Sequence, residues 1–146
     1  MASIHKEVVV DTPSEQVWSA VRDVGAIHTR LAPGFVTDTR LEDGFRTVTF
    51  GNGMVVRERI VDLDDRTRRL VWSVVGKPFE HYNASMQIFE EGEGRSRVVW
   101  IADLLPHELA TTVGSMIEQG LATIKRTLEQ QSSASKSSTS RSSAVR

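Results

Sequence analysis

The chain contains no cysteine, and this absence narrows its chemistry at once. Disulfides, thiolate nucleophiles and cysteine metal sites are all excluded. A net charge of -1 provides no general attraction to nucleic acid or to a membrane surface. The sequence also lacks an apolar run long enough for a signal peptide or a membrane span. We therefore expect a cytoplasmic protein with no nucleic-acid partner and no integral membrane association.

Several common catalytic signatures are missing as well. The sequence has no G-x-S-x-G elbow, no phosphate-binding glycine loop and no dinucleotide fingerprint. His5, His81 and His107 are scattered along the chain, and no pair of them has the spacing of a metal site. We expect neither a metal nor another cofactor.

The composition changes near the end of the chain. Residues 131–146 are mostly serine, carry Lys136, Arg141 and Arg146 without an acid, and have almost nothing apolar to bury. Such a segment cannot offset the entropy lost on ordering. The sequence therefore predicts one folded domain over residues 1–130, followed by a disordered, basic, serine-rich tail.

A strand and then a helix are predicted at the start of the domain. The strand is SIHKEVVVD, and the segment TPSEQVWSAVRDVG after it carries helix-start signals. Thr12 and Glu15 have the spacing of a capping box, and Pro13 suits the first helical position. We expect this helix to stop at Gly25, and the next segment, AIHTRLAPG, allows one or two further turns.

Short strands separated by turn signals fill the chain between Gly34 and Pro106. Dipeptides such as Asp43-Gly44 are typical of hairpin turns. No helical pattern interrupts the strands, which predicts an antiparallel meander. The predicted strands cover residues 35–42, 45–50, 54–63, 68–76, 81–90 and 95–105.

One long helix is predicted over residues 107–130, where apolar residues recur at helical spacing. We expect its apolar face to pack on the concave side of the sheet. Glycine inside a helix costs ~1 kcal/mol relative to alanine, so Gly120 on this face needs a reason. Close packing against strands and room for a ligand are both possible reasons. The apolar face comprises Leu109, Val113, Met116, Ile117, Gly120, Leu121, Ile124 and Leu128.

This order of elements, with the segment TPSEQVWSAVRDVGAIHTRLAP and the long last helix, resembles the START-related superfamily, which includes the birch pollen allergen and the polyketide cyclase/dehydrase-like (SRPBCC) proteins. The resemblance covers residues 2 to about 130. It implies an α+β helix-grip fold, in which a seven-stranded antiparallel sheet wraps around the C-terminal helix and two short helices follow the first strand. A weaker resemblance to the plant abscisic acid receptors runs through RERIVDLDDRTRRLVWSVVG and HYNAS. Members of the superfamily use an internal cavity for lipid transport, hormone sensing or ring cyclisation, so the fold does not decide the function.

Strand alternation predicts which residues would line such a cavity. In MVVRERIVD one face is apolar except for Glu58 and the other carries two arginines, so we place the first face inside. A carboxylate at Glu58 then needs a partner, a water molecule or a raised pKa, unless it is a half-exposed structural residue near the strand end. Trp72 is either cavity wall or an ordinary core residue. The predicted lining from these strands is Met54, Val56, Glu58, Ile60, Trp72 and Val74.

The strand HYNASMQIF is ambiguous. Alternation alone turns its apolar face inward, whereas the receptor resemblance turns Asn83 and Ser85 inward, and we keep both as candidate ligand contacts. In the following strand Asp103 shares a face with Ile101, which is a further candidate contact, and Trp100 lies on the opposite face. Asp103 lies near the strand end and is either a rim acid or a cap for the next helix.

His28 and Arg30 lie near the expected opening of the cavity, where the superfamily resemblance places the loops after the first helices. A histidine there has a pKa near the working pH and suits a general base, with Asp103 or Glu58 to orient it. The alternative is a structural hydrogen bond between His28 and a backbone carbonyl at the helix turn. Arg30 is a candidate polar anchor for a ligand.

Three functions are compatible with these patterns. The first is binding of a small, mostly hydrophobic molecule of lipid, polyketide or aromatic type, with Val113, Met116, Ile117 and Gly120 contacting it from the helix. The second is a polyketide cyclase or dehydratase that uses His28 with an acid. The third is a ligand-gated interaction module whose glycine-rich loops at 51–53 and 76–78 close over a ligand, although FGNGM replaces the receptors' gate sequence. We favour binding, because the sequence assigns no acid–base pair.

Overall fold

A computed structural model describes the backbone of residues 2–145 and the side chains of residues 2–133. Strands and helices follow one another almost as predicted, and each strand boundary lies within one residue of its expected place. The elements are β1 (Ala2–Val10), α1 (Ser14–Arg22), η1 (Ile27–Leu31), β2 (Val36–Glu42), β3 (Phe45–Phe50), β4 (Val55–Asp64), β5 (Arg69–Val75), β6 (His81–Glu90), β7 (Ser96–Leu105), η2 (His107–Leu109) and α2 (Ala110–Val145).

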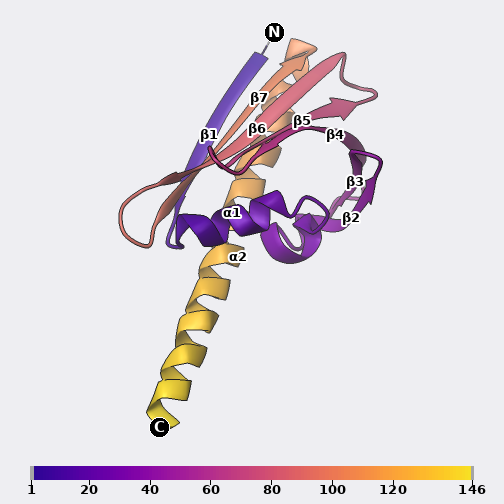
Figure 1. The fold of residues 1–146 in the computed structure, drawn as a ribbon. Helices are drawn as coiled ribbons and strands as arrows, with labels where there is room; N and C mark the ends of the chain where they lie inside the picture. Colours follow the sequence, from indigo (N-terminus) through magenta and orange to yellow (C-terminus); the bar gives the residue numbers. More distant parts are fainter. Residues whose placement is uncertain (1, 146) are drawn as a thin grey trace.

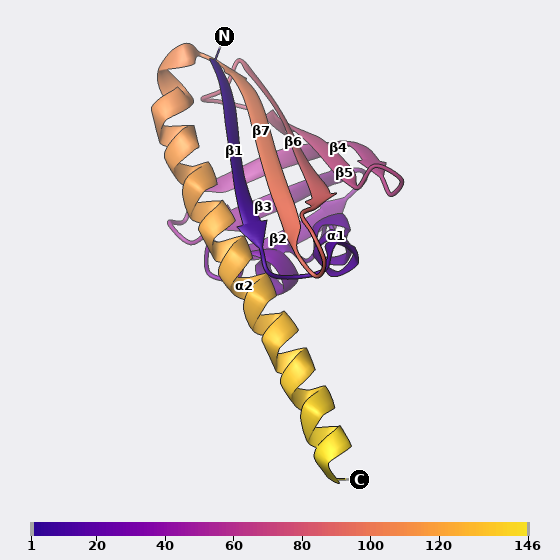
Figure 2. The ribbon, with the colours of Figure 1, turned by 90° about the vertical axis from the view of Figure 1, so that its left-hand side faces the viewer.

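The seven strands form one antiparallel sheet in the order β1-β7-β6-β5-β4-β3-β2. The last six strands make the predicted meander, and β1 pairs with β7 at the far edge. The sheet curls so that β2, β3 and β4 arch over toward α1 and η1 (Figure 1). α2 lies along the concave face and packs closely on β1 (Figure 2). This arrangement confirms the predicted α+β helix-grip fold.

The hydrophobic core lies between the concave face of the sheet and α2. Ile117, Ile124 and Leu128 are at most 2% exposed, as their helical spacing predicts. They meet inward side chains of the strands, such as Val98 and Leu104 of β7. Burying each such side chain stabilises the fold by roughly 1.5–3 kcal/mol, and this burial holds α2 on the sheet.

The backbone of α2 continues to Val145 and does not change at residue 131, where the composition predicts the start of a disordered tail. Side chains of residues 134–146 lie outside the described residues. The division into a domain and a disordered tail stays a prediction.

The predicted capping box at the start of α1 is wrong. The helix begins at Ser14 after Pro13, and no side chain caps it. The Thr12 side chain is buried, and its Oγ1 has no hydrogen-bond partner among the described residues. Ser96 Oγ of β7 instead donates to the Thr12 carbonyl at 2.6 Å and lies 3.1 Å from Ser14 Oγ. These contacts join the start of α1 to β7.

α1 is joined to the turn between β4 and β5. The Asp65 carboxylate accepts hydrogen bonds from Arg22 Nε and Trp18 Nε1, both at 2.8 Å. The Arg22 guanidinium, and after it the Trp18 indole, hold the pKa of the Asp65 carboxyl below its usual value. These bonds hold α1 against the end of the curled sheet.

We expect Asp65→Asn to lower the melting temperature at neutral pH, because the amide removes the negative partner of Arg22. The folded-state pKa of Asp65 is depressed, so its contribution to stability is complete above the unfolded pKa near 3.8 and is lost as the pH falls through the lower folded pKa. The difference in melting temperature between wild type and variant should therefore shrink below about pH 4. Thermal unfolding followed by circular dichroism across this pH range measures the difference.

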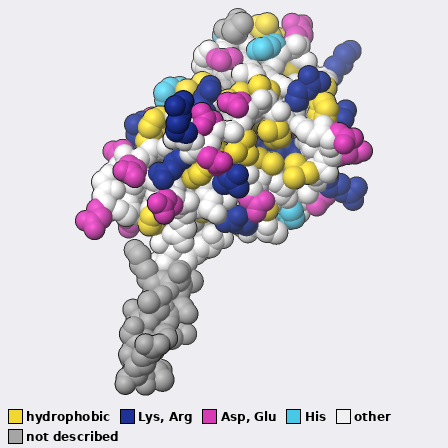
Figure 3. Space-filling view, viewed as in Figure 1, with side chains coloured by type: hydrophobic (Ala, Val, Ile, Leu, Met, Phe, Trp, Pro, Cys, Tyr) yellow, Lys and Arg dark blue, Asp and Glu magenta, His cyan; other side chains and the backbone are white. Residues whose placement is uncertain are grey.

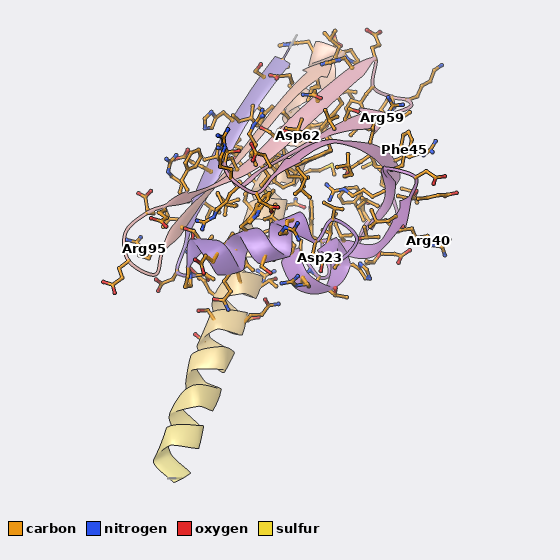
Figure 4. All side chains as sticks on the ribbon, in the orientation of Figure 1. Asp23, Arg40, Phe45, Arg59, Asp62 and Arg95 are labelled. Atoms are coloured by element: carbon orange, nitrogen blue, oxygen red, sulfur yellow. The ribbon has the colours of Figure 1, made fainter. Side chains whose placement is uncertain are left out.

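Asp62→Asn is the matched control, because Asp62 is an exposed aspartate of β4 (Figure 4). Equal losses in the two variants, or an Asp65→Asn loss that does not change with pH, would contradict the assigned role of Asp65.

Candidate functional site

Two small cavities lie between the concave face of the sheet and α2. We call the one beside Ile27 and Leu31 the η1 chamber, and the one beside Met54 and Phe79 the loop chamber. Each has a volume of about 60 Å³, well below the roughly 300–1,000 Å³ of typical ligand sites. In the space-filling view, hydrophobic side chains gather in the middle of the face that Figure 1 shows (Figure 3). Side chains therefore fill much of the space that the fold encloses.

Aromatic side chains form the boundary between the chambers. Phe35 and Phe50 meet edge to face, with ring centroids 5.4 Å apart. Trp72 and Trp100 make a second edge-to-face pair at 6.0 Å. These four residues and Glu58 line both chambers, and we call the four rings the aromatic boundary.

Gly120 of α2 faces this boundary. A Cβ atom at position 120 would lie 2.9 Å from Trp100 Cζ3 and 3.0 Å from Phe35 Cε2. Two aromatic rings therefore occupy the space beside the glycine. Close packing, one of the two reasons considered for this glycine, is the one that the structure supports.

A buried ion pair forms part of the chamber wall. Arg46 of β3 lies directly across from Glu58 of β4, and its Nε donates to Glu58 Oε1 at 2.7 Å. The two side chains are only 5% and 9% exposed. The guanidinium also lies over the Trp72 ring, 5.2 Å from the centroid. Glu58 thus faces inward as expected, and Arg46 is the partner that a buried carboxylate needs.

Two further hydrogen-bond donors line the cavity. Tyr82 lies in the loop chamber, edge to face with Phe79 at 4.8 Å. Burial raises the pKa of Tyr82 well above its usual range, and the negative charge of Glu58 raises it further. The phenol therefore stays protonated at neutral pH and remains a donor. Trp100 Nε1 is buried and has no hydrogen-bond partner within the described part of the chain.

Most predicted lining residues lie at the chambers. Glu58 and Trp72 line both of them, whereas Gly120 packs on their boundary without lining either. Ile60 is partly buried and lines neither. The following predicted residues line the loop chamber: Met54, Val56, Val74, Val113, Met116 and Ile117. Their contact with a ligand stays a prediction.

Asn83 and Ser85 do not line either chamber. Ala84 and Met86 of β6 face inward and are 2% and 3% exposed, so the alternating Asn83 and Ser85 lie on the outer face. Plain alternation therefore decides the ambiguous strand, and the inward placement suggested by the receptor resemblance is wrong.

Ile101 and Asp103 of β7 also lie on the outer face. Their neighbour Trp100 lines both chambers, and Leu104 is fully buried in the core. The Asp103 carboxylate accepts a hydrogen bond from Ser3 Oγ of β1. The prediction that Ile101 lines the cavity is therefore wrong, and Trp100 takes that place.

The structure does not bring His28 and Asp103 together. His28 Nδ1 lies 3.1 Å from Thr39 Oγ1 of β2, and β3, β4, β5 and β6 separate β2 from β7 in the sheet. Arg30 donates to Asp23 Oδ2 and Ser19 Oγ, both at 2.9 Å. Neither His28 nor Arg30 lines a chamber. Their hydrogen bonds join η1 to β2 and to the α1 region.

Arg46 was not predicted as a site residue, although its pattern carries the signal. In FRTVTF it shares a strand face with Val48 and Phe50, and all three line the η1 chamber. Phe35 was included in the predicted strand 35–42 but lies just before β2, and Phe79 lies in the connection between β5 and β6, so strand alternation places neither ring. On the opposite face of β3, Phe45 packs against Arg59 outside the curl (Figure 4), with the guanidinium 5.0 Å from the ring centroid.

The described residues contain no group of His, Asp and Glu side chains that could hold a metal ion. None of their helices is long and apolar enough to cross a membrane. The polar chemistry available at the cavity is therefore that of Arg46, Glu58, Tyr82 and Trp100.

Comparison with known proteins places the chain in a family. The model of the family described as polyketide cyclase / dehydrase and lipid transport matches residues 1–129. The chain belongs to this family. Its match spans every strand and the part of α2 that covers the chambers. No curated protein matches the chain.

Several solved structures have a similar fold. The protein XoxI from Bacillus cereus is 20% identical, with a TM-score of 0.79 over 88% of this chain and 96% of that one. A Thermobifida fusca protein is 27% identical, with a TM-score of 0.73 over 90% and 93% of the two chains. The di-domain ARO/CYC protein BexL of the BE-7585A biosynthetic pathway is 17% identical, with a TM-score of 0.70 over 88% and 47%. At sequence identities as low as those of XoxI and BexL, the similarity shows only that the fold is shared.

We expect Gly120→Ala to destabilise the protein by about 1–3 kcal/mol, because the added methyl group forces the Trp100 and Phe35 rings to shift. Gly114→Ala in the same helix is the control, since a Cβ at position 114 meets nothing within 4 Å. That change should stabilise the protein by up to about 1 kcal/mol through helix propensity. Urea unfolding of both variants measures the two effects, and a stabilised Gly120→Ala variant would contradict the packing described.

We expect Glu58→Leu alone to cost about 3–5 kcal/mol, because it leaves the Arg46 charge buried without its counter-ion. The double variant Arg46→Met/Glu58→Leu removes both charges and should recover most of that loss. Urea unfolding of the single and double variants tests this coupling. A double variant as unstable as the single one would mean that the pair does not act as a unit.

Proposed function

We propose that the protein binds one small, mostly hydrophobic molecule in the cavity between the sheet and α2. The observation that carries this proposal is the apolar interior, divided into two chambers, with a buried ion pair in its wall. Ligand sites are mostly apolar, with a few polar groups that fix orientation. The family description, which names lipid transport beside polyketide cyclisation, is consistent with it.

A ligand of ordinary size has to displace side chains from the interior. The chambers are about 60 Å³ each. Met54 is 38% exposed and lies beside the loop between β3 and β4, and Val74 precedes the loop between β5 and β6. Both line the loop chamber, which makes this end the natural route into the cavity.

Native mass spectrometry of freshly purified protein, followed by extraction under denaturing conditions, tests the proposal. We expect a stoichiometric apolar molecule, or else a thermal shift with a panel of lipids and aromatic polyketides. A ligand at a hundredfold excess over its dissociation constant stabilises the folded state by ~2.7 kcal/mol. An unloaded protein that responds to no member of the panel would contradict the proposal.

Val56→Phe and Val55→Phe form a matched pair for this test. Val56 lines the loop chamber, whereas the adjacent Val55 is 61% exposed on the other face of β4. We expect the ring at position 56 to fill the chamber and abolish the thermal shift, and the ring at position 55 to leave the shift intact. Equal responses would place the ligand elsewhere.

The second candidate function is that of a cyclase or dehydratase, with Tyr82 in place of His28 as the partner of the acid. Tyr82 and Glu58 both line the loop chamber, so a proton donor and a carboxylate face the same space. Glu58 would remove a proton from a carbon next to a carbonyl, and the Tyr82 phenol would donate to the carbonyl oxygen as negative charge develops there. Tyr82→Phe should then abolish turnover of an aromatic polyketide while leaving its binding intact, and undiminished turnover would exclude this role.

A further inference from the structure

We propose that the two chambers are the halves of one binding site and that the Phe35 side chain is the gate between them. The ligand of this site has two apolar lobes joined through a hydroxyl-bearing carbon. This inference rests on the proposed binding function. It adds the shape of the ligand and the residue that controls which ligands fit.

The division of the cavity depends on very few side chains. Phe35 and Trp100 both line both chambers, and both rings pack against the bare backbone of Gly120. Neither chamber alone approaches the size of a typical ligand site. A ligand that gains affinity through apolar contact must therefore occupy both halves, and for this one of the two rings has to move.

Phe35 is the ring that can move. Trp100 is held in β7, which pairs with β1 on one side and β6 on the other, and it also packs on Trp72. Phe35 lies in the connection between η1 and β2, and its ring packs edge to face on Phe50. The Phe35 carbonyl accepts a hydrogen bond from Gly51 N–H at 2.9 Å, which anchors the backbone. A side-chain rotation would therefore join the chambers without unpairing a strand.

The polar atoms at the boundary indicate what joins the two lobes. Of the residues that line both chambers, Glu58, Trp72 and Trp100 carry polar side-chain atoms, and of the two indole donors Trp100 Nε1 is the one that is buried without a partner in the described part of the chain. The Glu58 carboxylate accepts hydrogen bonds, and the Trp100 Nε1–H donates one but has no partner among the described residues. A hydroxyl group can donate to the first and accept from the second, whereas a carbonyl can only accept. A ligand hydroxyl would satisfy a buried donor that is otherwise left without a partner.

The walls beyond the boundary suit apolar lobes. Ile27 and Leu31 border the η1 chamber, and Val113 and Ile117 border the loop chamber. Each chamber has one polar side chain of its own: Arg46 in the η1 chamber, whose Nε is already occupied by Glu58, and Tyr82 in the loop chamber. The hydrogen-bonding centre of the ligand is therefore expected at the boundary, with an apolar group on each side.

Three simple probes test this shape. Benzyl alcohol has one ring and the hydroxyl, diphenylmethanol has two rings and the hydroxyl, and diphenylmethane has two rings without it. We expect diphenylmethanol to bind at least about tenfold more tightly than either of the others, because only it fills both halves and pairs the boundary atoms. Equal affinities for diphenylmethanol and diphenylmethane would overturn the hydroxyl part of the inference.

Titrations followed by the indole N–H signals in ¹H–¹⁵N NMR locate the hydroxyl. The Trp100 signal, assigned with Trp100→Phe, should shift on addition of diphenylmethanol. The Trp18 signal is the internal control, because Trp18 Nε1 already donates to Asp65 at 2.8 Å outside the chambers. Binding that leaves the Trp100 signal in place would overturn the assignment of this donor.

Phe35→Leu tests the gate while keeping an apolar side chain. We expect it to raise the affinity ratio of diphenylmethanol to benzyl alcohol at least about fivefold, because the barrier between the halves is removed. Phe89→Leu is the matched control, since Phe89 lines neither chamber and packs under Arg97, 4.8 Å from its ring centroid. An unchanged ratio in Phe35→Leu, or an equal change in Phe89→Leu, would overturn the gate.

The outcomes separate this inference from the function on which it rests. If wild type binds benzyl alcohol and diphenylmethanol equally and Phe35→Leu does not alter their ratio, the divided-site inference fails and the binding function stands. If neither wild type nor Phe35→Leu binds any probe, the divided-site inference fails, and the binding function fails with it only if the protein is also unloaded and responds to no member of the lipid and polyketide panel.

Discussion

The buried ion pair between Arg46 and Glu58 is the constraint around which the interior is organised. Two charges removed from water cost several kcal/mol each before their mutual attraction and hydrogen bonds are counted. The pair is 2.7 Å apart on adjacent strands and one of its members borders both chambers. A protein in which two hydrophobic residues of similar volume replace such a pair is often at least as stable. The position of this pair, at the centre of an otherwise apolar wall, is consistent with the ligand binding proposed above.

The aromatic boundary and Gly120 follow from the same geometry. α2 covers the concave face, and its approach is close enough that position 120 has no room for a Cβ atom beside Trp100 and Phe35. The rings divide the remaining space and hold the chambers apart. Edge-to-face pairs of this kind contribute about 0.5–1.5 kcal/mol beyond the area they bury, which is small enough for a ligand to replace. The packing that completes the core thus also defines the candidate site.

The polar residues that a search for catalytic groups would find first line neither chamber. Asp103 bonds Ser3, Arg30 bonds Asp23 and Ser19, and the His28 ring lies against Thr39. Each of these contacts joins neighbouring elements. Histidine and aspartate are common in active sites, but residue type alone does not distinguish an interior group from a surface one.

The sequence by itself determined the order of the strands and helices and the limits of the strands, because alternation and helical spacing are local properties of the chain. It also placed Glu58, Trp72 and the apolar face of α2 on the inside. Only the tertiary structure decided that Arg46 is the partner of Glu58, that Ser96 bonds the Thr12 carbonyl, and that Phe35 and Trp100 meet over Gly120. The first contact depends on the pairing register of β3 and β4, and the other two join residues that are far apart in the chain, so no local pattern encodes them.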